Sequence, residues 1–463
     1  MSCPSTFNKT SSELSFLSDA QLQACIHCGL CLPVCPTYEA TGSEAESPRG
    51  RLHLMKAWQD GSLDARAIEP HIDQCLGCMA CQTSCPSGID YNALLHQTRV
   101  VLADQPPSWR YHFKQWIKSF GVAEMLAKHK RLAMITHVLR FYQRLGIPQW
   151  VNQTGLLAFL SKTLQQQHAL MPNLLTDTAP PLVGHEIFEP TTITPHTPSV
   201  LLWTGCLMNA WFSHIHWATL RVLVAQGYRV ITVPSGCCGA LVHHSGDTRT
   251  SQTLGHQSLQ SIESTLTQAG LTLNDITAIV VNAAGCGSTL QEYNAFVEAT
   301  PEGFSAKVLD PLALLAQQPL DLSTWQPPSQ SLRVTYHAAC HLHHAQGVKT
   351  AHEIVMGHLP NVTWVLLAGY DQCCGSAGVF NVEYPQLAHD ILSPKIEALK
   401  ATGASVLLNS NPGCLMQWQS GCNDAHLDLE ILHPMEFLAK GYLPLPNEPH
   451  ETQRSICWTS SLH

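Results

Sequence analysis

No run of about 18 consecutive apolar residues occurs in the chain, so the sequence predicts no membrane-spanning helix. The first residues, MSCPSTFNKTSSELSF, lack a basic stretch followed by an apolar one, and we expect no secretory signal peptide. No Gly-x-Gly-x-x-Gly segment opens a helix after a strand, so we expect no flavin or nicotinamide site here. The chain has only 25 Lys and Arg but 34 Asp and Glu, and its net charge of −9 argues against general nucleic-acid binding. We therefore expect a soluble protein that is cytoplasmic, or peripheral at the inner face of the cell membrane.

Cysteine, by contrast, is abundant, with 19 residues in a chain of 463. A chain of this length can build hydrophobic cores without the disulfides that small secreted domains need, so the thiols are better interpreted as metal ligands. Two runs have the spacing C-x₂-C-x₂-C-x₃-C-P, which is typical of 4Fe–4S ligation. They are Cys25-Ile-His-Cys28-Gly-Leu-Cys31-Leu-Pro-Val-Cys35-Pro36 and Cys75-Leu-Gly-Cys78-Met-Ala-Cys81-Gln-Thr-Ser-Cys85-Pro86.

The fourth cysteine of each run ligates the other cluster in two-cluster ferredoxins, so the sequence predicts two crossed ligand sets. The first cluster takes Cys25, Cys28, Cys31 and Cys85, and the second takes Cys75, Cys78, Cys81 and Cys35. Pro36 and Pro86 are expected to stop any continuing helix and to turn the chain away after the last ligand. Zinc is the alternative, because C-x₂-C pairs also bind zinc, but two complete runs with trailing prolines favour iron–sulfur clusters.

The cluster-binding module is expected at residues 18–102 and to be mostly helical, since forty positions separate Cys35 from Cys75. Between the runs, residues 46–58 predict a turn that opens a helix. Arg49 and Arg51 in this segment either face an anionic cluster or a partner, or are surface charges; the sequence does not decide between these interpretations.

Residues 106–168 lack cysteine and predict a helical segment. Apolar residues alternate there with basic ones at helical spacing, as in Met125, Leu132, Ile135, Val138 and Leu139 among Lys128, Lys130, Arg131 and Arg140. Such a helix either packs on its own domain, which is the commoner case, or rests on anionic lipid or a partner subunit. Residues 171–199 are rich in proline and threonine and are predicted to form a linker.

The remainder of the chain repeats one pattern, first in residues 200–320 and again in residues 331–440. In each unit, short β-branched runs end in cysteine-bearing turns, and helical stretches separate the runs. This alternation predicts parallel α/β layers. We therefore predict an α+β multidomain protein with a mainly helical two-cluster ferredoxin module and two repeated α/β Cys-Cys-Gly units.

Each unit places four cysteines at the carboxyl ends of its predicted strands, where open α/β sheets bind ligands. They are Cys206, Cys237, Cys238 and Cys286 in the first unit, and Cys340, Cys373, Cys374 and Cys414 in the second. Their recurrence favours a metal or a cluster in at least one unit, against buried thiols without a redox role. Further candidates to ligate or hydrogen-bond a cofactor are His243, His244, His337 and His341. Three cysteines fit no pattern and are interpreted as spare thiols: Cys3, Cys422 and Cys457.

Taken together, these features resemble the glycolate oxidase iron–sulfur subunit family, and the resemblance covers nearly the whole chain. Its most specific parts are Cys25 through Cys35-Pro-Thr-Tyr38, Ser47-Pro-Arg-Gly-Arg51, Cys85-Pro-Ser-Gly88 and Cys373-Cys374-Gly-Ser-Ala-Gly378. Many Cys-Cys-Gly domains end in C-x-x-C, whereas this chain has Cys286-Gly-Ser-Thr289 and Cys414-Leu-Met-Gln417. A fifth thiolate is therefore missing from each unit, which argues against an unusual multi-thiolate cluster.

The resemblance implies a non-catalytic electron-transfer subunit of a complex that oxidises a 2-hydroxy acid. A flavin-bearing partner would oxidise glycolate to glyoxylate, and two 4Fe–4S clusters in this chain would pass the electrons to a quinone or another acceptor. Iron–sulfur subunits of D-lactate or anaerobic glycerol-3-phosphate dehydrogenases, and heterodisulfide-reductase-like catalytic subunits, look similar in outline. A structural or regulatory zinc protein is the remaining alternative.

Overall fold

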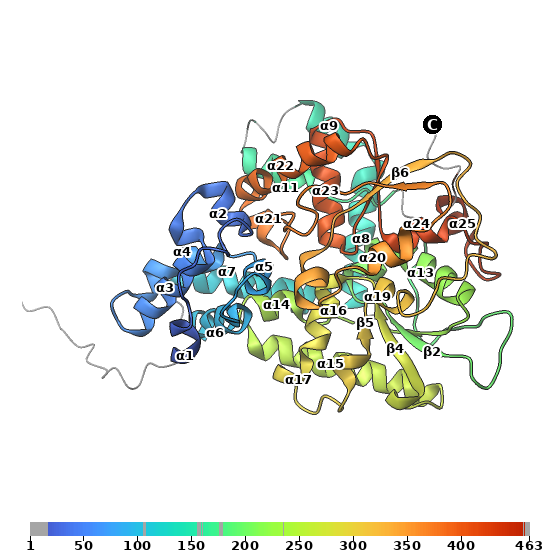
Figure 1. Ribbon diagram of the computed structural model, residues 1–463, viewed down its shortest axis with the longest axis horizontal. Coiled ribbons are helices and arrows are strands. Elements are labelled where there is room, and N and C mark those ends of the chain that lie inside the picture. Colours follow the sequence, from blue (N-terminus) through green and yellow to red (C-terminus); the bar gives the residue numbers. More distant parts are fainter. Residues whose placement is uncertain are drawn as a thin grey trace, which may run out of the picture.

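The computed structural model describes residues 17–104, 108–154, 159, 161–175, 179–234, 236–456 and 458. Figure 1 shows the amino-terminal helices at one end of the molecule and the two sheets at the other, with the helices of residues 108–169 running beside both parts. Cys3 and Cys457 lie outside the described residues.

Residues 17–104 form helices and turns and contain no strand. The elements are α1 (Asp19–Gln23), α2 (Pro36–Thr41), the 3₁₀ turn η1 (Glu44–Glu46), α3 (Pro48–Gln59), α4 (Ala65–Asp73), α5 (Ala80–Thr83) and α6 (Tyr91–Asp104). Helix α3 begins where Ser47 Oγ accepts a hydrogen bond of 3.0 Å from the Gly50 N–H. The fully buried side chains of Met55, Ile68 and Ile72 form part of the core of this module. Pro36 does not stop a helix as expected but opens α2 at its first position, where no N–H donor is needed.

The next segment, within residues 108–175, is also helical. It contains α7 (Trp109–Phe120), the π-helix η2 (Gly121–Leu126), α8 (His129–Arg144), α9 (Ile147–Thr154) and α11 (Lys162–Ala169). Among the described residues, no helix combines the length and the apolar character needed to cross a bilayer.

The first α/β unit contains a five-stranded sheet in the order β1-β3-β2-β4-β5. The strands are β1 (Ile187–Phe188), β2 (Ser199–Trp203), β3 (Arg229–Val233), β4 (Ile276–Val281) and β5 (Val308–Leu309). All neighbours are parallel except β1, which lies inside the expected linker and pairs antiparallel with β3. The helices are α12 (Leu207–Trp211), α13 (Ser213–Ala225), α14 (Ala240–His244), α15 (Thr248–Gln268), η3 (Leu273–Asp275), α16 (Ala284–Gln291), α17 (Tyr293–Phe296), α18 (Phe304–Lys307) and α19 (Pro311–Leu315).

The second unit has a parallel four-stranded sheet in the order β7-β6-β8-β9. Its strands are β6 (Leu332–Tyr336), β7 (Val362–Trp364), β8 (Val406–Leu408) and β9 (Glu430–Leu432). The helices are η4 (His341–Ala345, a π-helix), α20 (Ala351–Met356), α21 (Phe380–Glu383), α22 (Pro385–Thr402), α23 (Pro412–Asp424), α24 (Pro434–Ala439) and α25 (His450–Ser455). This order matches β3-β2-β4-β5 of the first unit, so the predicted repeat of a parallel α/β unit is confirmed.

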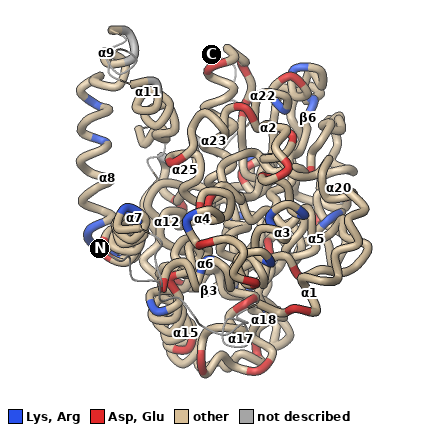
Figure 2. The backbone as a smooth tube through the Cα atoms, turned by 90° about the vertical axis from the view of Figure 1, so that its left-hand side faces the viewer, with Lys and Arg blue, Asp and Glu red and all other residues tan. Residues whose placement is uncertain are grey.

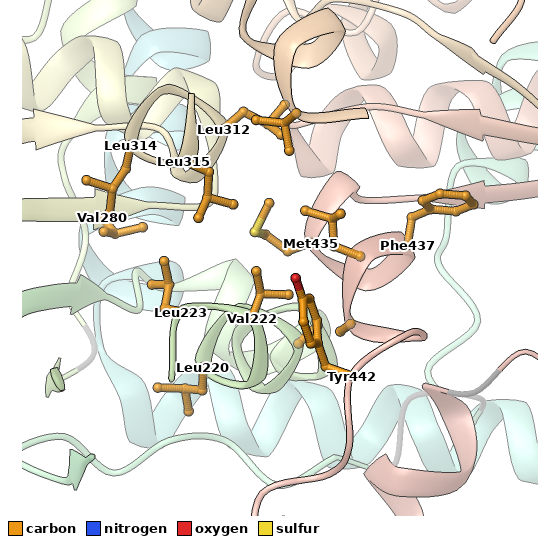
Figure 3. Close-up of a cluster of buried hydrophobic side chains, with 14 of the residues drawn as sticks. Leu220, Val222, Leu223, Val280, Leu312, Leu314, Leu315, Met435, Phe437 and Tyr442 are labelled. Atoms are coloured by element: carbon orange, nitrogen blue, oxygen red, sulfur yellow. The ribbon is translucent and has the colours of Figure 1, made fainter. Parts of the chain in front are cut away.

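The two units share one hydrophobic core (Figure 3). Side chains from α13, α19 and α24 point into it, among them Leu223, Leu315 and Met435. Burying a side chain of this size contributes about 1.5–3 kcal/mol, so separating the units would be costly. Buried Arg221 of α13 pairs with Glu448 and donates to the carbonyls of Ala439 and Ile456, which fixes the carboxyl-terminal segment on the first unit.

Candidate iron–sulfur sites

The first cavity of the helical module is lined by Cys25, Cys28, Cys31 and Cys85. It has a volume of about 460 Å³, part of which is open to solvent, and its other walls include Ile26, Leu52 and Ile89. Cys28 is exposed and the other three thiols are partly exposed. These four residues are the ligand set predicted for the first cluster.

A second cavity, of about 310 Å³, is lined by Cys35, Cys75, Cys78 and Cys81. Three of these cysteines are buried and Cys75 is partly exposed. This is the set predicted for the second cluster. Cys81, Pro48 and Tyr91 line both cavities, so the two candidate centres lie side by side.

The backbone curls around each cavity in the same way. The residue before the second cysteine and the residue after it both have positive φ in each run: His27 and Gly29 at 54° and 82°, and Gly77 and Met79 at 61° and 61°. Left-handed residues turn successive backbone N–H groups towards one centre, which suits an anionic group. The matched geometry at two sites argues for a common ligand chemistry.

Arg51 lies beneath the second cavity, with 1% of its surface exposed. Its guanidinium donates to Thr37 Oγ1 at 3.1 Å and to the Glu46 carbonyl at 2.6 Å, and it pairs with the Glu46 carboxylate. Burial alone would lower the pKa of Arg51, but nearby Cys75 and Tyr91, together with Cys35 and Glu46, raise it above its ordinary value. The interpretation of Arg51 as a surface charge is therefore wrong. Arg49 lines the first cavity while its Nε pairs with Glu44 at 2.6 Å.

Polar groups also face two sulfurs of the second set. Cys35 Sγ lies 3.3 Å from Thr37 Oγ1, and Cys75 Sγ lies 3.7 Å from Tyr91 Oη. Burial raises the pKa of Cys78 and of Cys81. Such thiols ionise readily when a metal or another positive charge lies close to them. Four thiols, apolar walls and a buried arginine in one cavity, and four thiols in the other, fit two four-thiolate centres.

In the first Cys-Cys-Gly unit the thiol of Cys237 lies beside that of Cys206, and the thiol of Cys238 lies beside that of Cys286. Cys237 and Cys238 are buried, and the other two are partly exposed. Cys206 and Cys237 pack against Val122 and Leu126 of η2. Cysteines from different turns thus lie beside one another, and their role as ligands of a metal or cluster stays a prediction.

In the second unit the thiols lie in succession, with Cys373 beside Cys340 and Cys374, and Cys414 beside Cys374. All four cysteines are buried. Cys340 and Cys373 pack in one cluster of buried side chains with Cys78 of the helical module. Among the described residues, no group of three or more Cys, His, Asp or Glu side chains is arranged to hold a single metal ion.

The four candidate histidines have different surroundings. His337 accepts from Asn409 through Nδ1 at 2.9 Å and donates through Nε2 to the Gln372 carbonyl at 2.8 Å, so both nitrogens are occupied. Burial lowers the pKa of His337 to about 3, which keeps the ring neutral. His243 stacks between His96 and Phe296. His341 Nδ1 lies 3.6 Å from Cys340 Sγ, and the His244 and His341 rings are 5.2 Å apart.

Lys395 was not predicted from the sequence. It is buried on α22, and its ammonium donates to Gln372 Oε1 at 2.8 Å, beside Cys373 and Cys374. The sequence signal that could have identified Lys395 is its position on the apolar face of the helix, which Ile391, Leu392 and Leu399 define. Cys422, interpreted as a spare thiol, packs in the core beneath the second sheet.

A dicluster module joined to two cysteine-rich α/β units defines the iron–sulfur electron-transfer subunit of an oxidoreductase complex. Residues 21–89 match the family described as "4Fe-4S dicluster domain", and residues 200–291 and 334–419 match "Cysteine-rich domain". Residues 113–171 match "Glycolate oxidase iron-sulfur subunit, linker region".

Two similar proteins span most of the chain, and a third spans about half of it. A probable glycolate oxidase iron–sulfur subunit of Bacillus subtilis is 31% identical over 419 residues, 88% of this chain and 90% of the relative. The glycolate oxidase iron–sulfur subunit of Escherichia coli is 28% identical over 86% of this chain and 89% of its own length. A lactate utilization protein A of Exiguobacterium is 25% identical over 53% of this chain and 98% of its own length. The chain belongs to the glycolate oxidase iron–sulfur subunit family, as its sequence motifs predicted.

Proposed function

We propose that this chain passes electrons from a flavin-containing partner, which oxidises glycolate to glyoxylate, to a quinone or another acceptor. The observation that carries the proposal is the pair of adjacent cavities, the first lined by five cysteines and the second by four, with Cys81, Pro48 and Tyr91 as shared walls. The names of the two relatives that span the chain support glycolate as the substrate of the complex.

We further propose that the first cavity holds a 4Fe–4S cluster on Cys25, Cys28, Cys31 and Cys85, and the second holds one on Cys75, Cys78, Cys81 and Cys35. Such clusters, when bound, take up and release one electron at a time. The crossing of the fourth cysteines holds the two cavities together, because each run contributes to both.

The surrounding residues would then set the properties of the second centre. Arg51 provides a buried positive charge, and the hydroxyls of Thr37 and Tyr91 stand within reach of Cys35 and Cys75. Hydrogen bonds and charge near the sulfurs stabilise the more negative, reduced state. The first centre lies nearer to solvent because Cys28 and Ile26 are exposed, and this is where a partner could approach.

The cysteines of the two Cys-Cys-Gly units are a further proposed binding site for a metal or cluster. The second unit is the stronger candidate, because its four cysteines are all buried and two of them pack in one cluster with Cys78. Lys395 would balance negative charge on ionised Cys373 and Cys374.

The function can be tested by purifying the chain without oxygen together with its native partners. Reduction of an acceptor dye is measured with glycolate, D-lactate and glycerol 3-phosphate in parallel, and iron, zinc and acid-labile sulfide are determined on the same sample. Glycolate-dependent reduction by an iron- and sulfide-loaded complex is expected. Activity with another substrate alone would refute the glycolate assignment, and a zinc-loaded, colourless protein would refute the cluster assignment.

A further inference from the structure

Helix α7 turns its large apolar side chains outwards. Their exposed fractions range from 43% to 74%, for Trp109, Phe113, Trp116, Ile117 and Phe120. The spacings of four, three, one and three residues place all five on one side of the helix. Neighbouring rings stack within this stripe, with centroids 6.0 Å apart for Phe113 and Trp116 and 5.3 Å for Trp116 and Phe120. An amphipathic helix of a soluble protein ordinarily buries such a stripe.

Helix α8 repeats this arrangement. Met134, Val138 and Phe141 on the helix and Leu145 at its end are 58% to 63% exposed and again follow a helical spacing. The buried residues of α8 are Leu132, Thr136 and Gln143, two of which are polar. Four apolar side chains therefore face away from the protein, although the buried side of α8 includes two polar residues.

The orientation of α7 is fixed by contacts on its inner side. Lys114 pairs with Asp73 at 2.5 Å, and Lys118 pairs with Glu383 at 2.9 Å. Tyr111 is buried on the same side. These contacts tie α7 to the helical module and to the second α/β unit, so the aromatic stripe cannot turn inwards without breaking them.

The charge of the two helices is opposite to that of the whole chain. Their sequences, WRYHFKQWIKSF and HKRLAMITHVLRFYQR, hold seven Lys or Arg and no Asp or Glu, whereas the net charge of the chain is −9. Two of the seven, Lys114 and Lys118, face inwards and are paired with Asp73 and Glu383. Lys130 and Arg144 are exposed on α8, whereas Arg131 is exposed but pairs with Glu124 of η2. Arg110 stacks over Trp109 with 5.8 Å between the guanidinium carbon and the ring centre. Figure 2 shows α8 at one edge of the molecule, with Lys and Arg along it and α7 beside its foot.

We propose that α7 and α8 form a docking face for the surface of an anionic phospholipid bilayer. Tryptophan and phenylalanine on one face with Lys and Arg beside them are the pattern of helices that lie in the lipid interface. Each basic residue near an anionic surface contributes about 1 kcal/mol, and the acidic remainder of the chain disfavours other orientations. The proposal goes beyond electron transfer and does not depend on which substrate the complex oxidises.

The test is co-sedimentation of the purified, cluster-loaded chain with vesicles of phosphatidylcholine alone or mixed with phosphatidylglycerol. Binding to the mixed vesicles is expected to be about tenfold tighter and to weaken as salt is added. The double variant Phe113→Ser/Trp116→Ser should lose most of this binding, because it removes two exposed rings that would enter the interface. The matched control is Ile354→Ser/Leu366→Ser, which removes residues of 52% and 68% exposure outside the two helices and should bind like the parent.

Three results would overturn the proposal. The first is equal binding to both kinds of vesicle, or none. The second is binding that the Phe113→Ser/Trp116→Ser variant retains. The third is that the parent does not bind vesicles but associates with itself or with a partner subunit, and that the Phe113→Ser/Trp116→Ser variant loses this association. The face would then be a protein interface. Iron content and circular dichroism of each variant check that the fold and the clusters persist.

Discussion

The two Cys-Cys-Gly units share a strand order, but their cysteines have different neighbours. In the second unit Cys340 and Cys373 pack against Cys78 of the cluster-binding module. In the first unit Cys206 and Cys237 pack instead against η2, the segment that connects α7 to α8. The same scaffold thus places one set of thiols beside a candidate cluster and the other beside the proposed docking face.

The difference extends to burial and charge. All four thiols of the second unit are buried, whereas two of the four in the first unit, Cys206 and Cys286, are partly exposed. In the second unit α22 brings Lys395 to the thiols, whereas in the first unit α15 brings Ser258, which donates to the Cys237 carbonyl at 3.1 Å. A repeated fold therefore does not imply a repeated function.

The largest effect is expected from replacing a proposed cluster ligand. Cys28→Ala and Cys78→Ala should each remove one cluster and lower acceptor reduction by on the order of 100-fold, while substrate still reduces the partner's flavin. Only Cys78→Ala should also disturb the second unit, since only Cys78 packs against Cys340 and Cys373. Iron content, electron paramagnetic resonance and dye reduction measure these changes. Cys422→Ala, a buried cysteine outside both sets, is the control. Normal acceptor reduction by either ligand variant would contradict the assignment.

A sharper test of the asymmetry compares equivalent cysteines of the two units. Cys373→Ser should shift the resonance spectrum of the second cluster and lower electron transfer by about tenfold, because it alters a polar neighbour of that cluster. Cys237→Ser, the matched control in the first unit, should leave that spectrum unchanged, since Cys237 packs against η2. A larger spectral change in Cys237→Ser would mean that the first unit is the redox neighbour.

Much of this organisation could be predicted from the sequence because it rests on local spacing. The two cysteine runs, the alternation of β-branched runs with helices and the duplicated Cys-Cys-Gly turns are all short-range patterns, and both parallel sheets agree with them. The fourth strands, β5 and β9, were not predicted. They have only two and three residues, too few for a periodic signal, and their positions depend on neighbours distant in the sequence.

The surroundings of the cysteines could not be predicted because they depend on how the modules dock. Nothing near Cys78 in the sequence indicates Cys340 or Cys373, which lie about 260 and 295 positions further along the chain. The burial of Arg51 depends on how α3 packs against α4, which the sequence does not show. In the structure, Arg51 Nε donates to the His71 carbonyl of α4 at 2.7 Å. For residues 106–168 the helical pattern was visible, but the outward orientation of its apolar side was not.

The glycines after the paired cysteines offer a smaller, purely structural comparison. Gly239 and Gly375 have φ of 80° and 87°, a conformation that strains any other residue. A Cβ at Gly375 would lie 2.8 Å from the Ala388 carbonyl oxygen, and one at Gly239 would lie 3.2 Å from that of Ser251. We expect Gly375→Ala to lower the free energy of unfolding by about 3 kcal/mol and Gly239→Ala by about 1–2 kcal/mol. Urea unfolding measures both values, and a reversed order would contradict the closer packing of the second unit.

The smallest expected effect concerns the N-cap residues of two helices, whose pKa values are shifted in opposite directions. Asp310 precedes α19 and accepts from the Leu312 N–H, while His433 precedes α24 and accepts from the Met435 N–H. Burial raises the pKa of Asp310 to about 7, and burial lowers the pKa of His433 to about 4 although Glu436 opposes this shift.

The two caps should therefore give stability opposite dependences on pH. The Asp310 contribution is fully present below its ordinary pKa of 3.8 and is lost as pH rises through about 7. The His433 contribution is present above 6.5 and is lost as pH falls through about 4. Asparagine keeps a capping oxygen at either site without titrating. As pH rises from about 5 to about 8, the free energy of unfolding of Asp310→Asn should increase by about 1–2 kcal/mol relative to that of the parent. That of His433→Asn should decrease relative to the parent by a similar amount. Urea unfolding of both variants and the parent across this range measures how the difference in the free energy of unfolding changes with pH. A change of the same sign for both variants would contradict the opposite pKa shifts of Asp310 and His433.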